Sequence, residues 1–157
     1  MMASILMFSG VIATLVAGVF LSFSDFVMRG LARAPDAHGA AGMVGLNRAV
    51  YRSVFMVMLL GLFPSAIVIA MIALLQFPDA ARAFTLIGSA TYLLGVMAVT
   101  VLGNVPMNTR LDNMSAHPRE LADYWPAYVR SWTRLNHVRT ASALTTGACW
   151  LTASSLI

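Results

Sequence analysis

Long stretches of this sequence contain no charged side chain, and this property constrains its fold more than any other. A helix needs about 20 mostly apolar residues to cross roughly 30 Å of hydrocarbon. Four runs meet this requirement: Met1–Ser24, Val54–Leu75, Phe84–Leu102 and Thr140–Ile157. With their ends included, they predict membrane spans at about residues 3–26, 53–76, 83–104 and 138–157. The predicted fold is therefore all-α, a polytopic membrane four-helix bundle forming a single domain over residues 1–157.

The composition argues against a water-soluble domain. Hydrophobic residues make up 59% of the chain and charged residues 10%, whereas soluble domains carry roughly 25% charged residues. So few polar side chains could not cover the surface of a soluble core of this size. The bilayer is therefore the expected surroundings of most of the chain.

Three of the runs carry features that refine this prediction. Met1–Ser24 resembles the apolar part of a signal peptide, but no basic residue precedes it, so we expect a retained helix. Pro64 interrupts the second run and is expected to bend a membrane helix rather than break it. The last run is rich in small residues, and Ala143 and Gly147 have the spacing that permits close helix packing.

The arginines predict the orientation in the membrane. All ten basic residues are arginines, and only Arg82 lies in the short connection between the second and third runs. The other nine flank the two long connections: Arg29, Arg33, Arg48, Arg52, Arg110, Arg119, Arg130, Arg134 and Arg139. The positive-inside rule places both long connections in the cytoplasm and both termini on the periplasmic side of the inner membrane.

The cytoplasmic connections are predicted to extend the helices beyond the bilayer. His117-Pro118 and Trp125-Pro126 each have the form of a helix start, with proline in the first turn. The arginines form no basic helix or arm, so lipid headgroups are the expected partner of this positive charge and nucleic acid is not.

The segment before the last run carries an aromatic and polar stripe. At roughly 100° per residue, Trp125, Trp132, Asn136 and Arg139 fall within about 60° of one another on a helix. His137 points about 120° away from that stripe. Tryptophans in such positions also commonly anchor helices at headgroup depth, so the stripe has a structural interpretation beside a functional one.

Further polar side chains are expected at the same membrane level. Asn104 and Asn108 share a stripe at the end of the third run, Asn47 precedes the second run, and Asp25 stands four residues before an arginine. A structural role is open to each, because asparagines also cap or join helices and Asp25 is in register for an ion pair. Their convergence with the aromatic stripe favours a pocket with apolar walls and a few polar groups, which suits a small lipophilic ligand.

Metal and cofactor signatures are missing from the sequence. It contains no His/Cys cluster at metal-ligand spacing, no glycine-rich phosphate loop and no nucleophile elbow. The single cysteine, Cys149, excludes an internal disulfide. We therefore expect neither a metal nor a cofactor.

Two short elements carry a family resemblance. NVPMNTRL at Asn104–Leu111 is similar to an NxPxNxxL element, and WTRLNHVR at Trp132–Arg139 is similar to a W-x3-N-x2-R element. Both elements, together with Phe20–Phe55, resemble the membrane family of largely unknown function that includes the anthrone oxygenases. The resemblance extends from about Gly18 to Thr140 and implies four membrane spans.

The resemblance implies oxidation of an anthrone to an anthraquinone without metal or flavin. Deprotonation would give an electron-rich carbanion that reduces O₂, so the protein must supply a base, donors for an oxyanion and shelter from water. The predicted catalytic residues are His137 as the first choice of base, Asp25 as the second choice, and Asn136 and Arg139. The predicted substrate-binding residues are Asn47, Asn104, Asn108, Trp125 and Trp132.

Two other functions compete with this one. A non-catalytic subunit of a larger membrane complex would need no base, and the short chain with its small-residue faces is compatible with it. A transporter is disfavoured, because the charge-free runs contain no ion pathway and the chain has no inverted repeat.

Overall fold

The protein is built from four helical rods that lie side by side. The computed structural model describes residues 1–34 and 37–157, and these contain helices but no strand. The first rod consists of α1 (Met2–Ser22), a π-helical turn (Phe23–Val27) and α2 (Met28–Ala32). In the second rod a turn at 51–53, which we call the elbow, joins α3 (His38–Val50) to α4 (Val54–Gln76). The all-α prediction is therefore confirmed.

The third rod is helical from end to end but changes its winding along the way. It consists of α5 (Asp79–Thr91), two π-helical segments (Tyr92–Ala98 and Thr100–Asn104) and α6 (Val105–Asn113). Pro106 lies in the first turn of α6, and because it has no N–H to donate, the wider π-helical winding directly precedes it. The fourth rod is one long helix, α7 (Pro118–Ser154).

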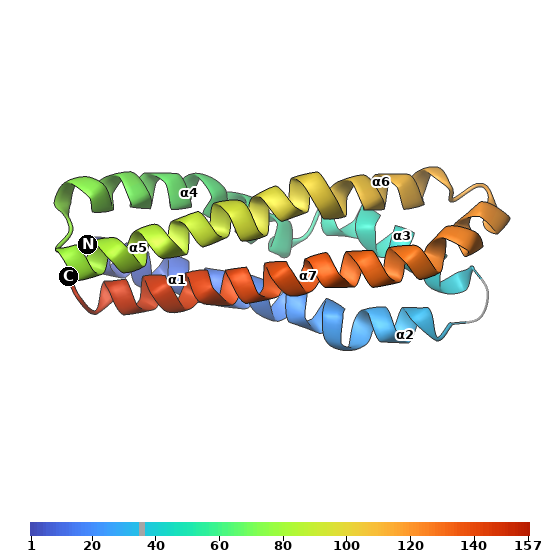
Figure 1. Ribbon diagram of the computed structural model, residues 1–157, viewed down its shortest axis with the longest axis horizontal. Coiled ribbons are helices and arrows are strands. Elements are labelled where there is room, and N and C mark those ends of the chain that lie inside the picture. Colours follow the sequence, from blue (N-terminus) through green and yellow to red (C-terminus); the bar gives the residue numbers. More distant parts are fainter. Residues whose placement is uncertain (35–36) are drawn as a thin grey trace.

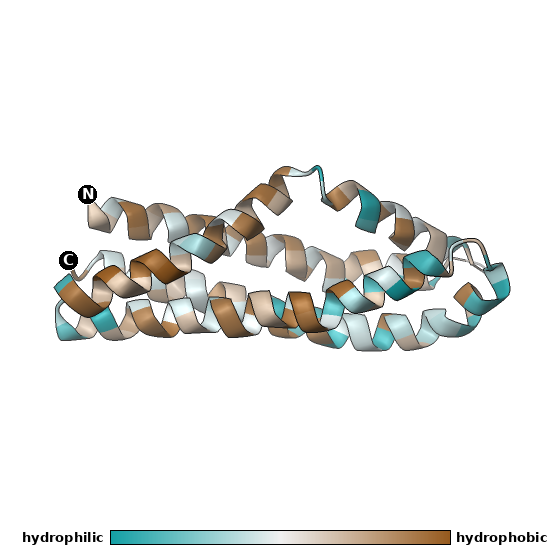
Figure 2. Ribbon diagram, turned by 90° about the horizontal axis from the view of Figure 1, so that it is seen from above, coloured by the Kyte–Doolittle hydropathy of each residue, from teal (hydrophilic) through white to brown (hydrophobic). Residues whose placement is uncertain are grey.

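Both termini lie at the same end of the bundle, together with the turn between α4 and α5 (Figure 1). We call this the termini end. The end of α2, the start of α3 and the α6–α7 connection lie at the opposite, distal end (Figure 1). Apolar segments dominate the half near the termini, whereas hydrophilic segments gather towards the distal end (Figure 2).

Among the described residues, three helices are long and apolar enough to cross a membrane: Met2–Ala32, Val54–Gln76 and Asp79–Asn113. α7 is not among them, because arginines occupy its first half and serine, threonine, glycine and alanine dilute the apolar residues of its second half. That second half nevertheless packs along α1 and α5. The structure thus gives three of the four predicted spans by length and composition, and the fourth stays a prediction.

Small residues allow α1 and α7 to approach closely. A Cβ added at Gly147 would collide with Thr14 and lie 3.0 Å from the carbonyl oxygen of Gly10. About one turn further along α7, Trp150 is fully buried and stacks on Tyr92, with ring centroids 6.4 Å apart. The prediction of close packing by small residues in this segment is confirmed.

The structure agrees with the predictions made for two prolines and disagrees with the prediction for a third. α7 begins at Pro118 with His117 as its N-cap residue, as predicted, and α4 runs unbroken through Pro64. The predicted helix start at Trp125-Pro126 is wrong, because Pro126 lies inside α7. Pro126 has no N–H to donate to the carbonyl of Ala122, four residues earlier in the helix. Both residues are exposed, so this carbonyl remains open to solvent.

Candidate functional site

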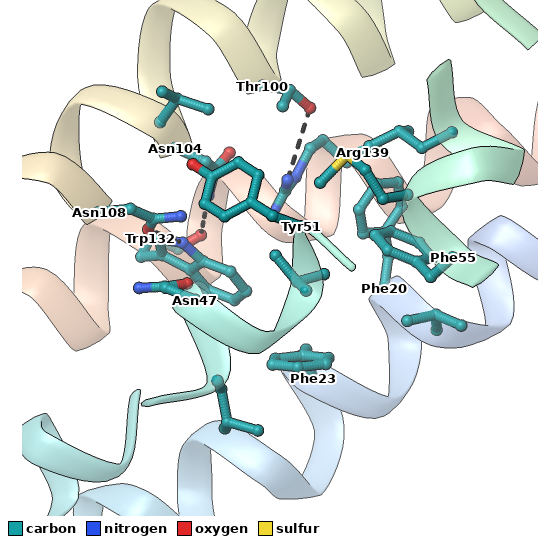
Figure 3. Close-up of a pocket in the computed structure, with 16 residues that line it drawn as sticks. Phe20, Phe23, Asn47, Tyr51, Phe55, Thr100, Asn104, Asn108, Trp132 and Arg139 are labelled. Carbon is teal, nitrogen blue, oxygen red and sulfur yellow. Dashed lines mark hydrogen bonds between the residues drawn. The ribbon is translucent and has the colours of Figure 1, made fainter. Parts of the chain in front are cut away.

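A pocket lies beneath the elbow, about midway along the bundle. Its volume is about 90 Å³, and α1, α3, α4, α6 and α7 all contribute to its walls. Much of the wall is apolar and aromatic, including Phe20, Phe23, Phe55 and Leu59. Since one water needs roughly 10–15 Å³ of such space, the pocket has room for a group of several atoms. The polar side chains around it are shown in Figure 3.

Arg139 is the most unusual residue of this wall. Only 6% of its surface is exposed, and the carbon of its guanidinium lies 4.4 Å from the ring centre of Phe20 and 5.1 Å from that of Trp132. Its Nη2 donates to the Asn136 Oδ1 at 2.7 Å, and its Nη1 donates to the Thr100 hydroxyl at 3.5 Å (Figure 3). Its Nε has no partner among the described residues.

This buried cation also has no carboxylate beside it in the described part of the chain. The three ion pairs there use other arginines: Arg29–Asp25, Arg48–Asp112 and Arg82–Asp79. Burial of an unpaired charge is costly unless hydrogen bonds or a counter-ion compensate for it. Two aromatic faces and two neutral acceptors compensate for part of this cost, so an anion in the pocket would stabilise Arg139 further.

Asn104 offers a second unused polar atom. It is almost fully buried, and its amide nitrogen donates to the backbone oxygen of Trp132 at 3.3 Å (Figure 3). Its Oδ1 has no partner among the described residues. Two residues of the pocket wall therefore each keep one buried polar atom without a partner among the described residues, an acceptor on Asn104 and a donor on Arg139.

Asn108 holds the aromatic wall in place. Its Oδ1 accepts from the Trp132 indole N–H at 2.9 Å and from the Tyr128 hydroxyl at 2.8 Å. Asn47 completes this group by donating to the Tyr128 oxygen at 3.4 Å. These bonds tie α3, α6 and α7 together and fix the plane of the Trp132 ring at the pocket.

Tyr128 belongs to the hydrogen-bond network behind the pocket wall, and our sequence interpretation missed it. It is fully buried and stacks between Trp125 and Trp132, with ring centroids 5.5 Å and 6.3 Å away. Burial raises the pKa of its phenol, so the hydroxyl stays a neutral donor. Its position three residues after Trp125 and four before Trp132 puts it on the same helical stripe, and that spacing was the available signal.

Trp125 and Asn136 support the site without lining it. Trp125 is buried in the distal core as the outer member of the aromatic stack. The amide nitrogen of Asn136 donates to the carbonyl of Phe20 and to the hydroxyl of Ser24, while its oxygen accepts from Arg139. Asn136 thus joins α1 to α7 and orients Arg139.

The structure brings neither of the two predicted bases to the pocket. His137 is exposed and does not line it, and Asp25 is exposed and bonded to Arg29 at 2.7 Å. No described histidine, aspartate or glutamate lines this pocket. Within the described residues, no group of three or more His, Cys, Asp or Glu side chains is placed to hold a metal ion. The pocket thus combines a cation, amides and aromatic rings, but no strong base.

Tyr51 is a further pocket residue that was not predicted as a site residue. It lies in the elbow, lines the pocket (Figure 3) and is 62% exposed. Asn47, one helical turn earlier, was predicted as a substrate-binding residue and does line the pocket. A spacing of four residues allows both side chains to reach the same wall.

Comparison with known families gives one result. The family model described as anthrone oxygenase matches residues 48–149, well over half of the chain. The matched segment includes both short elements, at 104–111 and 132–139, and most of the pocket wall. No curated protein and no solved structure matches the chain.

Proposed function

This chain belongs to the anthrone oxygenase family, and on that premise we propose that it is an integral membrane protein that oxidises a flat, lipophilic aromatic ketone with O₂. The observation that carries the proposal is Arg139, a buried cation without a carboxylate partner in the described chain, at the wall of an aromatic pocket. The pocket admits a group of several atoms, so the carbonyl end of the ring system would enter between the aromatic walls and place its oxygen near this guanidinium. An oxygen that becomes negative during the reaction would then be stabilised where it forms.

The reaction balances without a cofactor. The CH₂ group between the two aromatic rings of an anthrone loses a proton, and its electron pair is delocalised onto the carbonyl oxygen. The carbanion reduces O₂ and forms a C–O bond, which gives a hydroperoxide after protonation. Loss of water then produces the second carbonyl, so that one CH₂ and one O₂ give one C=O and one H₂O. The protein's part is to stabilise the oxyanion and to keep bulk water from the intermediate.

We propose that no side chain acts as a strong base in this pocket. A cation beside the ketone oxygen favours the ionised form of the ligand and therefore lowers the pKa of its C–H group. The proton can then leave to water at the pocket mouth. This proposal replaces His137 as the base, since that side chain is exposed and lies outside the pocket.

Four membrane spans with both termini on the periplasmic side fit this site. If α1 and α5 cross the bilayer, the second half of α7 between them must cross it as well. The cytoplasmic headgroups of the inner membrane then surround three arginines: Arg52 in the elbow, and Arg48 and Arg110 beyond the apolar segments. The pocket beneath the elbow would lie just inside that boundary, where a lipophilic ligand concentrates.

Oxygen uptake tests the proposal. The full chain in lipid nanodiscs is mixed with anthrone, and O₂ consumption is followed together with anthraquinone formation. We expect a rate above the spontaneous one, and a fall of roughly 100-fold in Arg139→Gln, since removal of one oxyanion donor has effects of this order. Arg134→Gln, an exposed arginine on the same helix, should behave like the wild type. No uptake above the spontaneous rate would remove the catalytic proposal.

One observation favours the alternative of a non-catalytic subunit. Asn136 and the oxygen of Asn108 are already engaged in bonds within the bundle, as expected if these residues only join helices. Purification in mild detergent followed by mass spectrometry separates the two functions. A stoichiometric partner protein and no bound small molecule would favour the subunit, whereas a bound aromatic ketone would favour the enzyme.

A further inference from the structure

A second hollow lies on the outer face of the elbow. Its volume is about 420 Å³, and Val54, Val57 and Leu60 of α4 form its apolar side. Arg52 also lines it and forms no ion pair among the described residues. We call this hollow the outer groove. It combines an apolar surface with a free cation.

The outer groove and the pocket share two residues. Tyr51 and Met56 line both of them. These two side chains therefore form the partition between the inner pocket and the outside of the bundle. Tyr51 is 62% exposed, so its ring is not held by tight packing on all sides.

The groove opens onto a strongly apolar surface. Val54 and Val57 are 75% and 72% exposed. Near the pocket residue Thr100, Val101 and Leu102 are also exposed. Large apolar side chains that are exposed on a helix of this hydropathy face hydrocarbon in a membrane. The groove thus meets the bilayer, with Arg52 at the headgroup side.

In the described chain, the polar side-chain ties of this segment to other helices lie on either side of the partition, while Phe55 packs its ring against Phe20. Before it, Arg48 forms an ion pair with Asp112 at 2.9 Å; after it, the carbonyl of Leu59 accepts from the Tyr92 hydroxyl at 2.7 Å. Between these anchors the side-chain hydrogen bonds are local, such as that of Ser53, whose hydroxyl accepts from the Met56 amide. The elbow also projects from the bundle midway along its length (Figure 2). A segment with few ties of this kind can open at low cost.

We infer that the outer groove is the access site through which the pocket's ligand arrives from the bilayer, and that Tyr51 and Met56 form its gate. The occupant is a membrane-dissolved flat aromatic molecule with an ionisable oxygen, since the groove repeats the pocket's combination of apolar surface and arginine. The inference rests on the proposed function, because one ligand occupies both sites in turn. It deepens that function by making the bilayer, and not the cytoplasm, the source of the substrate.

The test measures binding rates with a ligand that cannot be oxidised further. 2-Hydroxyanthraquinone is mixed with the full chain in nanodiscs of fixed lipid composition, and the shift of the ligand's visible absorption band on ionisation of its hydroxyl beside Arg139 reports occupancy of the pocket. Val57→Trp fills the outer groove without touching the pocket. We expect it to lower the association and dissociation rates together by about fivefold and to leave the Kd within about twofold, as for an obstructed route. Val68→Trp, on an exposed part of α4 outside the groove, is the control.

Opening the gate should have the opposite effect. Tyr51→Ala is expected to raise both rates by about fivefold or more. Phe26→Ala is the matched control, because Phe26 is also 62% exposed and lines neither hollow. Unchanged binding rates in both Val57→Trp and Tyr51→Ala would overturn the access route. So would an equal slowing by Val57→Trp and by the control Val68→Trp, because the effect would then not depend on the groove.

The same assay tests the proposed function separately, through the equilibrium binding of the ligand. If Arg139→Gln weakens equilibrium binding, the pocket is the binding site whatever the rates of the gate variants. If the wild type binds no ligand, or Arg139→Gln binds it equally well, the proposed function fails and the access route fails with it. A groove occupied only by bilayer lipid would leave the ligand's rates insensitive to Val57→Trp, and this outcome too overturns the inference.

Discussion

The two halves of the bundle are held together by different chemistry. Near the termini, hydroxyls mostly return to carbonyls of their own helix, as Thr85 does to Ala81, and the helices meet through small residues such as Gly10 and Gly147. In the distal half, side-chain hydrogen bonds join distant segments. For example, the amide nitrogen of Asn136 in α7 bonds to the Phe20 carbonyl and the Ser24 hydroxyl of the first rod. The first half resembles the packing of membrane helices without a hydrophobic driving force, and the second resembles a polar and aromatic core.

The pocket lies where these two kinds of packing meet. Phe20 and Leu59 belong to the core near the termini, whereas Trp132 belongs to the distal core. A polar network that satisfies all its members rigidifies a site. Here the network satisfies Asn108 but leaves the Nε of Arg139 and the Oδ1 of Asn104 free. Thus one half supplies the scaffold, and the polar network leaves one donor and one acceptor unused on residues of the pocket wall.

The largest effect is expected from Gly147→Leu, which attacks the scaffold. A Cβ at this position collides with Thr14, so α1 and α7 must separate along their shared face. We expect a loss of about 3 kcal/mol or more in the free energy of unfolding, at the upper end of overpacking effects. Thermal unfolding in mild detergent measures it.

Gly18→Leu provides the matched control for this substitution. A Cβ at Gly18 meets nothing within 4 Å, so the variant should unfold close to the wild-type temperature. Equal stability of Gly147→Leu and Gly18→Leu would show that small residues do not determine the packing of this half.

Next in size is the effect of Asn136→Asp on the polar half. The Asn136 oxygen accepts from the Arg139 Nη2 at 2.7 Å, so a carboxylate there would give Arg139 the counter-ion that it lacks. We expect oxygen uptake with anthrone to fall by roughly 10-fold to 100-fold, because the guanidinium would then stabilise the developing oxyanion less. The rate is measured in nanodiscs as for the wild type.

A double-mutant cycle separates this electrostatic effect from the lost amide donor. If the introduced carboxylate acts by neutralising Arg139, adding Asn136→Asp to Arg139→Gln should lower the rate little further. A fully additive loss would mean that Asn136 supports activity through α1 alone.

The same contrast between the halves explains what the sequence could predict. Charge-free runs and small-residue spacing follow from the chain's own periodicity, so α1, α4 and the close approach at Gly147 were predictable. The aromatic and polar stripe also correctly grouped Trp132 and Arg139, because both lie on one helix. Residues that are neighbours along α7 needed only the helical angle.

The remainder of the site depends on contacts between helices, which periodicity does not give. A helical wheel separates His137 from Arg139, but it cannot tell which of the two faces meets α1 and the pocket. Likewise, Asn136 was predicted as catalytic because nothing in the sequence revealed that the Phe20 carbonyl would take up its amide. The elbow was missed for a related reason, since Tyr51 gains its position from a turn between two helices.

A smaller effect is expected from Tyr128→Phe, which removes one hydroxyl from the polar half. Asn108 would lose a donor and Asn47 an acceptor, so we expect a loss of about 1–2 kcal/mol in the free energy of unfolding. The stacking on Trp125 and Trp132 is retained by phenylalanine. Urea or thermal unfolding at neutral pH measures the difference.

The pH dependence gives this prediction a second readout. Because burial raises the folded-state pKa of Tyr128 above its unfolded value, the folded protein holds this proton more tightly. Its contribution to stability is present below the unfolded pKa of about 10 and falls as the pH rises beyond it. Unfolding temperatures between about pH 9 and 11 should therefore drop more steeply in the wild type than in Tyr128→Phe, and parallel curves would contradict a buried phenol.

The smallest effect is expected from His137→Ala, which tests the boundary of the site itself. The side chain is exposed and lies on the far side of α7 from the pocket-lining Arg139. We expect the rate of anthrone oxidation to stay within about twofold of the wild type, as for a surface substitution. A large loss of rate would restore His137 as the base and would mean that the working site extends beyond the pocket to the exposed face of α7.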